Sequence, residues 1–170
     1  VKAYAFTSLC DTLINLREIY RRVFTKPTLE LSIPITRTEE ARRSYLTSVV
    51  KSLTEGLEEI TGNKITPESL TKAAKLHGRT REMQRDLYRI RRELPGVVSN
   101  HDFYTALKAG FFLPAAVYHR KLEDLLQNLN GLKDDKANRP KLLLSGMVFD
   151  PLEIYKIIDE LDVCIADDDF

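Results

Sequence analysis

The amino-acid sequence predicts a helix-rich α/β fold, with parallel strands near both ends and a long helical segment between them. Two observations lead to this prediction. Short apolar runs at residues 3–9, 141–145 and 163–166 have the length and composition of strands. Between residues 38 and 129, apolar side chains recur every three or four positions, which is the period of an amphipathic helix. More than half of the residues should therefore be helical.

The first part of the chain is predicted as a strand, a helix and a second extended segment. Residues 3–9 alternate small and large side chains, and a helix is expected from about Asp11 to Val23 because its apolar residues share one face. Residues 25–36 contain two prolines that bracket an alternating segment. This pattern favours a short edge strand or an ordered crossing segment.

Two long helices are predicted next, starting at Thr38 and at Thr66. Both threonines are suited to the N-cap position, and acidic residues follow each of them in the first turn. Gly62 suits the left-handed conformation that ends a helix, and Pro95 stops the second one. Two further helices are expected, from Ser99 or Asn100 to Leu107 and from Pro114 to Leu129, with a turn over 109–114.

The last part of the chain is predicted as one parallel βαβ unit. It comprises strand Lys141–Ser145, a loop over 146–149, helix Asp150–Leu161 and strand Val163–Ala166. The polar segment 130–139 before it is the best candidate domain boundary. We therefore expect residues 1–135 to be the C-terminal part of a first α/β domain with a helical insertion. Residues 136–170 would begin a second, truncated α/β domain, so that two Rossmann-like halves are joined by the helices.

The ends of the sequence suggest a piece of a longer protein. The chain lacks an initiating Met and stops directly after a predicted buried strand. Strands without their neighbours expose unpaired edges, which recruit partners. We therefore expect residues 141–170 to self-associate, burying a set of apolar side chains against another copy: Leu142, Leu144, Ile157 and Ile165.

Composition excludes some function classes. The chain has 26 basic and 25 acidic residues, whereas a dedicated nucleic-acid binder usually carries a strong basic excess. The basic stretch Arg79–Arg92 is interrupted by acidic residues and is interpreted as a solvated helix face, with an anionic-ligand surface as the alternative. No apolar run approaches the roughly 20 residues that span a bilayer, and no signal-peptide pattern is present. Two widely separated cysteines form no disulfide framework, so the cytoplasm is the expected compartment.

Cys10 is the residue most suggestive of chemistry. It lies where the first strand should lead into a helix, and the positive end of a helix dipole favours the thiolate that a metal ligand or nucleophile requires. The alternative is a small buried residue at a strand end. Cys164 lies inside an apolar strand, where packing is its expected role.

The ends of the last two strands offer further candidates. Ser145 and Gly146 follow one strand, and a glycine there lets the backbone approach a ligand, although many strand–helix turns use glycine for geometry alone. Asp167 and Asp168 begin an acidic triplet after the other strand. The triplet is interpreted either as a metal or ribose site or as a solvated loop. The sequence shows no histidine ligand spacing, Walker loop, GxGxxG motif or Ser/His/Asp constellation.

Four segments together resemble the iron–sulfur subunits of the 2-hydroxyacyl-CoA dehydratase and benzoyl-CoA reductase family. Their order and spacing cover nearly the whole chain, and the family's subunits are about twice as long. The segments are Phe6-Thr7-Ser8-Leu9-Cys10-Asp11; residues 57–66 with Leu70 and the Arg79–Arg92 helix; residues 109–114; and residues 140–146 with Asp150-Pro151 and Ala166-Asp167-Asp168.

The resemblance implies a cytoplasmic, oxygen-sensitive enzyme of two related subunits, each with a [4Fe–4S] cluster. It also implies a separate ATP-hydrolysing iron–sulfur activator that delivers one electron, and an acyl-CoA substrate. The dehydratases eliminate water from a hydroxyacyl-CoA through a ketyl radical, whereas the reductases deliver low-potential electrons to an aromatic acyl-CoA ring. The dehydratase, a lyase, is the first interpretation. The alternatives are a reductase subunit and a non-catalytic supporting subunit.

Only Cys10 matches a cluster-ligand position of the family, whose subunits use three cysteines each. Cys164 does not match one. The chain by itself is therefore expected neither to assemble a stable cluster nor to catalyse a reaction. Ser145, Gly146, Asp167 and Asp168 would face the cleft of the longer protein as candidate substrate-binding residues.

Overall fold

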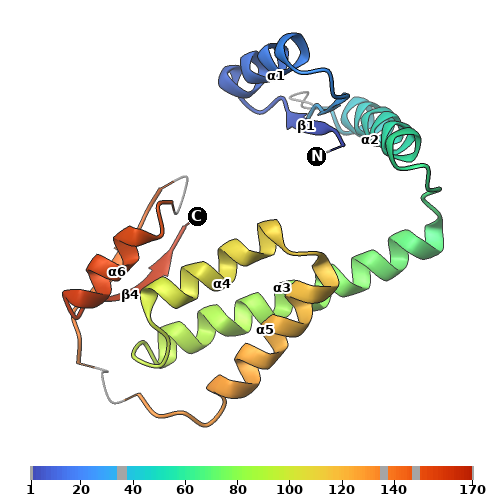
Figure 1. Ribbon diagram of the computed structural model, residues 1–170. Coiled ribbons are helices and arrows are strands. Elements are labelled where there is room, and N and C mark those ends of the chain that lie inside the picture. The colour runs from blue at the N-terminus through green and yellow to red at the C-terminus, as the bar shows by residue number, and fades with distance from the viewer. Residues whose placement is uncertain (1, 34–37, 135–137, 147–149, 170) are drawn as a thin grey trace. The chain divides into compact units, whose positions relative to one another are not determined.

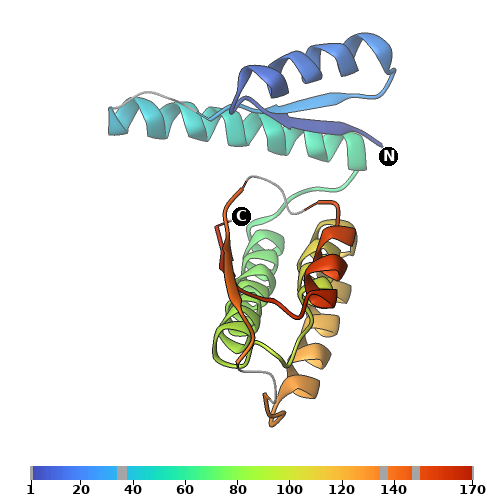
Figure 2. The same cartoon turned by 90° about the vertical axis from the view of Figure 1, so that its left-hand side faces the viewer.

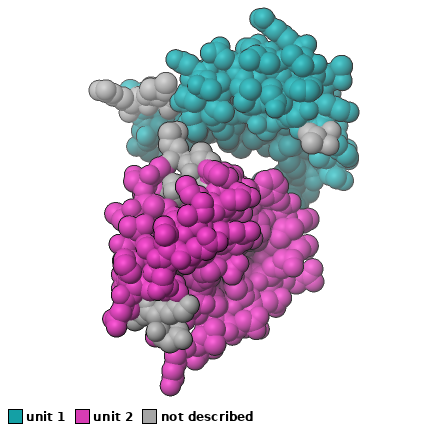
Figure 3. All heavy atoms as spheres, turned by 60° about the vertical axis from the view of Figure 1, so that its left-hand side comes forward, with its two compact units in different colours: residues 1–70 teal, residues 71–170 magenta. Residues whose placement is uncertain are grey.

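The computed structural model describes residues 2–33, 38–134, 138–146 and 150–169. In these ranges six helices and four short strands form, and more than half of the residues are helical (Figure 1 and Figure 2). The predicted helix-rich α/β class is confirmed. The chain divides into two compact units, residues 1–70 and 71–170 (Figure 3).

The first unit begins with a βαβ motif. Strand β1 (Tyr4–Thr7) leads into helix α1 (Asp11–Val23), and strand β2 (Thr28–Leu31) then pairs with β1 in parallel. Tyr4 lies opposite Thr28 and Thr7 opposite Leu31. The extended segment predicted after the first helix is therefore a strand, and it is the parallel neighbour of β1.

Helix α2 (Glu39–Thr61) completes the first unit and packs against β2. Gly56 permits this close approach, because a Cβ at its position would lie 2.6 Å from Leu29 Cδ2. The helix ends at Gly62, whose φ of 73° is the left-handed conformation expected there.

The apolar side chains of the first unit are only partly covered. None of its described residues is buried, although both helices carry the predicted apolar stripes. Several large apolar side chains are exposed: Leu9, Ile19, Val23, Tyr45 and Val50. A parallel sheet normally has both faces covered. The two-stranded sheet of this unit is therefore covered less completely than a parallel sheet normally is.

The second unit packs a βαβ motif on a layer of helices. The helices are α3 (Pro67–Glu93), α4 (Asn100–Phe112) and α5 (Ala115–Leu129), and the motif consists of β3 (Lys141–Leu144), α6 (Glu153–Glu160) and β4 (Cys164–Asp168). Strands β3 and β4 pair in parallel, and α6 packs against α4. The buried core joins residues of all but β3: Leu87, Val98, Phe103, Tyr104, Tyr118, Leu122, Leu129, Tyr155 and Ile165.

Asn100 attaches β4 and α6 to the start of α4. Its side-chain nitrogen donates to Asp159 Oδ1 at 2.7 Å and to the Val163 carbonyl at 2.8 Å. Its side-chain oxygen accepts the Ile165 N–H at 2.9 Å. Asn100 is 5% exposed, so these bonds are protected from water. The side-chain amide of Asn100 thus provides hydrogen-bond partners for the Val163 carbonyl and the Ile165 N–H, as a neighbouring strand would do in a larger sheet.

Several predicted boundaries differ from the structure. Helix α4 continues from Leu107 to Phe112, so the turn before α5 is much shorter than expected. Helix α6 begins at Glu153, because the Asp150 carboxylate pairs with Lys108 instead of capping a helix. Strand β4 extends to Asp168 instead of ending at Ala166. Of the loop predicted over 146–149, residues 147–149 lie outside the described residues.

The compact units divide between Leu70 and Thr71, so residues 71–135 belong to the same unit as the C-terminal βαβ motif. The physical reason is that the C-terminal βαβ motif shares its core with the preceding helices, since Tyr155 and Ile165 join Phe103 and Tyr104. How these segments divide among the domains of a longer protein stays a prediction. None of the helices in the described ranges combines the length and apolar character that crossing a bilayer requires.

Self-association through residues 141–170 stays a prediction, but its expected contact residues need correction. Ile165 is 1% exposed because the unit's own core covers it, so it is not available to another copy. Leu142, Leu143 and Ile157 remain exposed. We expect sedimentation of the chain to depend on concentration, and Leu143→Asp to reduce this dependence by placing a charge on the exposed strand. A strictly monomeric chain at high concentration would contradict the prediction.

Candidate functional site

Cys10 occupies the position predicted for it in the first unit. It follows the carboxyl end of β1 and is the N-cap residue of α1, where its carbonyl accepts the Ile14 N–H at 3.2 Å. Its thiol is free and the residue is exposed, so the alternative of a small buried residue is wrong. An exposed thiol at the positive end of a helix dipole is accessible to a metal or an electrophile. Its role as a ligand stays a prediction.

Cys164 has the packing role expected of it. It is 2% exposed, and its thiol donates to the Pro95 carbonyl at 3.1 Å within the second unit. A [4Fe–4S] cluster is normally held by four cysteine thiolates. The chain contains two cysteines, and one of them is buried and hydrogen-bonded. This chain alone therefore does not fit a complete cluster, although Cys10 could supply one ligand.

Ser145 and Gly146 meet the acidic triplet at the carboxyl edge of the second sheet. The Ser145 hydroxyl donates to Asp169 Oδ2 at 2.9 Å, and the Gly146 N–H donates to Asp169 Oδ1 at 3.1 Å. The loop after β3 therefore already holds a carboxylate of the same chain, as an anionic ligand would be held. Asp169 was not among the residues predicted to make this contact.

Asp168 does not lie in a solvated loop. Its side chain is 1% exposed and accepts three hydrogen bonds. Arg91 Nη2 and the Tyr104 hydroxyl donate to Oδ2, both at 2.7 Å, and the Tyr88 hydroxyl donates to Oδ1 at 2.9 Å. In this arrangement the carboxylate is already fully engaged. A direct contact with substrate would require it to leave these donors.

Arg91 corrects the interpretation of residues 79–92 as a solvated face. It is 2% exposed, and its guanidinium lies over the Phe103 ring at 3.8 Å from the centroid. A desolvated cation over an aromatic face is attracted by the ring quadrupole. We call Tyr88, Arg91, Phe103, Tyr104 and Asp168 the Asp168 cluster. These residues attach the end of β4 to α3 and α4.

The sequence contained one signal for this cluster. Arg91 lies four residues after Leu87 and eight after Met83, both of which belong to or contact the core, so Arg91 continues the apolar stripe of α3. A charged residue in such a stripe is rarely buried without a partner. Asp167 is the less protected neighbour, since it is half-buried and pairs with the exposed Arg92 at 3.1 Å.

A β-bulge explains why Asp168 turns inward. Leu142 lies opposite Ile165 and Leu143 opposite Asp167, so the register skips Ala166. Side chains alternate between the faces of a regular strand, which would place Ile165 and Asp168 on opposite faces. The extra residue shifts this alternation. Both side chains can therefore reach the helical layer, Ile165 in the core and Asp168 in its cluster.

The tyrosines of the Asp168 cluster should resist ionisation. Burial, followed by the negative charge of Asp168, raises the pKa of Tyr88 above its ordinary value of 10.0. Burial and the hydrogen bond to Asp168 raise the pKa of Tyr104 in the same direction. The folded state thus holds these protons more tightly than the unfolded state. The contribution of these tyrosines to the free energy of unfolding should therefore be constant below about pH 10 and should decrease as the pH rises further.

Absorbance of tyrosinate in native and urea-unfolded chain checks this expectation. Native protein should ionise fewer of its seven tyrosines at moderately alkaline pH than unfolded protein does. Tyr104→Phe should make stability decline less steeply with rising pH, because it removes one of the four tyrosines whose pKa is raised in the folded state. If all seven tyrosines ionise together near pH 10 while the chain remains folded, the proposed effect of the cluster is wrong.

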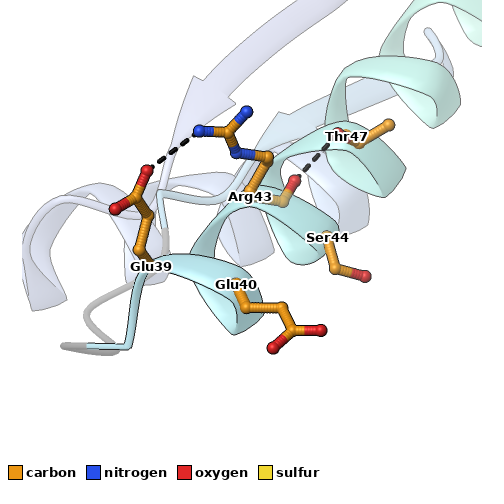
Figure 4. A pocket seen from close by; sticks show the side chains of 5 residues that line it. All are labelled: Glu39, Glu40, Arg43, Ser44 and Thr47. Carbon is orange, nitrogen blue, oxygen red and sulfur yellow. Dashed lines mark hydrogen bonds and ion pairs between the residues drawn. The ribbon is translucent and has the colours of Figure 1, made fainter.

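A separate hollow lies on α2 of the first unit (Figure 4). It has a volume of about 640 Å³ and is lined by residues from adjacent turns of that one helix: Glu39, Glu40, Arg43, Ser44 and Thr47. Arg43 Nη2 donates to Glu39 Oε1 at 2.9 Å, and the Thr47 hydroxyl donates to the Arg43 carbonyl at 2.8 Å. Glu39, Arg43 and Thr47 thus bond within the helix itself, and the hollow offers no group that would select a particular ligand. It contains none of the predicted site residues.

Comparison with known proteins gives consistent matches along the chain. Residues 1–170 match the family model described as 2-hydroxyglutaryl-CoA dehydratase, D-component. A benzoyl-CoA reductase subunit from Thauera aromatica is 28% identical over 100% of this chain and 45% of that protein. The (R)-phenyllactyl-CoA dehydratase beta subunit of Clostridium sporogenes is 25% identical over 96% of this chain and 44% of that protein.

A third relative is the beta subunit of (R)-2-hydroxyglutaryl-CoA dehydratase from Acidaminococcus fermentans, 27% identical over 95% of this chain and 43% of that protein. Each of these three names describes one subunit of an enzyme. The chain spans less than half the length of the curated relatives it matches.

Proposed function

Because the chain belongs to the 2-hydroxyglutaryl-CoA dehydratase D-component family over its whole length, we propose that it is part of an iron–sulfur subunit of a 2-hydroxyacyl-CoA dehydratase. The intact enzyme would be a lyase that removes water from a hydroxyacyl-CoA. The match over residues 1–170 is the observation that carries the proposal. Two relatives named as dehydratase beta subunits, each aligned over nearly all of this chain, support it.

Within that enzyme, Cys10 is proposed as one ligand of a [4Fe–4S] cluster. Its exposed, free thiol at the start of α1 supports the assignment, because ligands from other parts of the protein could approach the same iron atoms there. The remaining ligands would come from other parts of the longer protein. The proposed partners are a homologous second subunit and an ATP-dependent iron–sulfur activator, and the cytoplasm is the proposed compartment.

At the edge of the second sheet, Ser145, Gly146 and Asp167 are the accessible candidates for contact with the substrate. Ser145 and Gly146 offer a hydroxyl and a backbone N–H that bind a carboxylate of Asp169, and a ligand could compete for the same donors. Asp168 is proposed to hold β4 in place through its buried cluster, with any direct contact requiring rearrangement.

A benzoyl-CoA reductase subunit is the second candidate function. The specific observation in its favour is the 28% identity with a benzoyl-CoA reductase subunit across this entire chain. The names of both enzyme types refer to thioesters of coenzyme A. Measuring which thioester the intact enzyme converts therefore distinguishes the two candidate functions.

The test uses the intact subunit, purified without oxygen together with its partner subunit and activator. We expect ATP-dependent loss of water from a 2-hydroxyacyl-CoA and no reduction of benzoyl-CoA. The reverse result would favour the reductase. Activity with neither substrate, in a complex that retains its iron, would contradict both enzyme assignments for this subunit.

Cys10→Ser in the intact subunit should remove most of the cluster iron and sulfide, because a serine oxygen is a poor ligand for iron in such clusters. Cys164→Ser is the matched control, since the serine hydroxyl can still donate to the Pro95 carbonyl. It should leave the iron content unchanged. Equal iron in the Cys10→Ser and unsubstituted proteins would overturn the ligand assignment.

A further inference from the structure

A small pocket lies among α3, α4 and α5 of the second unit. It has a volume of about 230 Å³ and is separate from the predicted site residues. Its lining comes from all three helices and from the short turn between α4 and α5: His77, Thr80, Arg81, Gln84, Leu107, Gly110, Phe111, Leu113, Ala115 and Tyr118. All of these residues belong to one compact unit, so the pocket is defined within that unit.

The inner wall of the pocket is held in one arrangement. Tyr118 is 6% exposed, and its hydroxyl accepts a hydrogen bond from Gln84 Nε2 at 3.1 Å. Gly110 lies directly against the Tyr118 ring, because a Cβ at that position would be 3.0 Å from Cε1 and Cζ. Thr80 is also buried, and its hydroxyl oxygen lies 2.9 Å from His119 Nδ1. The inner wall is therefore held in position, whereas Arg81 and His77 lie at the exposed side of the pocket.

The electrostatic character of the pocket favours an anion. Arg81 and His77 contribute the ionisable nitrogen groups of the lining, and no acidic residue is among the lining residues. Within the described residues, neither side chain pairs with a carboxylate. An arginine with its donors open can bind a carboxylate through two parallel N–H bonds.

The remaining lining is apolar. Leu107, Leu113 and Ala115 present hydrocarbon to the space beside the basic side chains. Pockets for drug-sized ligands have volumes of roughly 300–1,000 Å³, so this one suits a smaller molecule. We propose that this pocket binds a small organic carboxylate with an apolar body. The carboxylate would lie at Arg81 and the hydrocarbon against the leucines.

Titration of the isotope-labelled 170-residue chain by NMR tests the proposal, with benzoate, hexanoate and the uncharged benzyl alcohol as probes. We expect saturable shifts of amide signals confined to residues 77–84 and 107–118. Benzoate and hexanoate distinguish an aromatic from an aliphatic body, and tighter binding of either one supports the proposal. Benzyl alcohol should bind at least about tenfold more weakly than benzoate, because it cannot pair with Arg81.

Arg81→Gln should weaken benzoate binding about tenfold. The matched control is Arg79→Gln, which removes the same charge two residues away, on nearly the opposite side of α3. It should leave binding unchanged. Gly110→Ala should also weaken binding, since Tyr118 must move to accommodate the new methyl group.

The spectrum of each variant without ligand shows whether it is folded, so a loss of binding is interpreted only where the signals outside the pocket are unchanged. Three outcomes would overturn the proposal: shifts scattered over the surface, equal effects of the two arginine substitutions, or benzyl alcohol binding as tightly as benzoate. These results do not depend on the iron–sulfur assignment, because the probes and readout involve neither a cluster nor a thioester.

Discussion

Asp168→Asn is expected to lower the free energy of unfolding of the second unit by about 3–5 kcal/mol, the range found when one partner of a buried ion pair is removed. The asparagine has nearly the same shape but no charge to balance the buried guanidinium of Arg91. Its side-chain NH₂ would also replace one of the two oxygens that accept the hydrogen bonds from Arg91, Tyr88 and Tyr104. Hydrogen exchange of peptides from α3 and β4 measures the effect within the second unit.

Asp167→Asn is the matched control for this substitution. Asp167 is adjacent in the sequence and also pairs with an arginine, but both partners are substantially exposed to water. Exposed pairs of this kind contribute about 0–1 kcal/mol. The two substitutions should therefore differ by several-fold in their effect on exchange. Similar exchange rates in both variants would mean that the buried pair does not stabilise the fold.

Asn100→Ala should destabilise the second unit by about 2–4 kcal/mol. The substitution leaves the Val163 carbonyl and the Ile165 N–H without their partner in a place that water does not reach. Each buried backbone group without a hydrogen bond costs about 1–3 kcal/mol. Urea unfolding followed by tyrosine fluorescence measures the loss, and exchange of the Ile165 amide should increase the most.

Asn128→Ala provides the comparison for Asn100→Ala. Asn128 is an exposed residue of α5, so its replacement tests the same chemical change without the buried contacts. It should change stability by no more than about 0.5 kcal/mol. If both alanine variants unfold at the same urea concentration, Asn100 does not have the proposed role at β4.

The elements that the sequence predicted well are those with strong local signals. Helices α2 and α3 begin at or just after Thr38 and Thr66, and α2 ends before Gly62, because capping preferences act within a few residues of the chain. The position of Cys10 follows from the same logic, since a strand and an amphipathic helix flank it. Local signals do not show which elements share a core. They therefore did not indicate that residues 71–135 share a compact unit with the C-terminal motif, and the domain boundary near residue 135 stays a prediction.

The role of Asp168 depends on contacts between distant residues, and this is why the sequence did not reveal it. Asp168 meets Arg91, which is 77 positions away, only because a bulge near Ala166 turns the end of β4 toward the helices. A regular alternation of the strand would have placed the carboxylate on the other face. The acidic triplet therefore suggested one solvated loop, whereas its first two members lie in different environments.

The difference in exposure between the two cysteines provides a way to measure the opening of the second unit. A thiol reagent should modify Cys10 at once, because that residue lies open at the start of α1. Cys164 can react only when β4 separates from Pro95, so its rate of alkylation counts local unfolding events. Mass spectrometry distinguishes the two modified peptides. The rapid reaction of Cys10 thus serves as an internal reference, and the slow reaction of Cys164 reports how often the C-terminal strand unfolds locally.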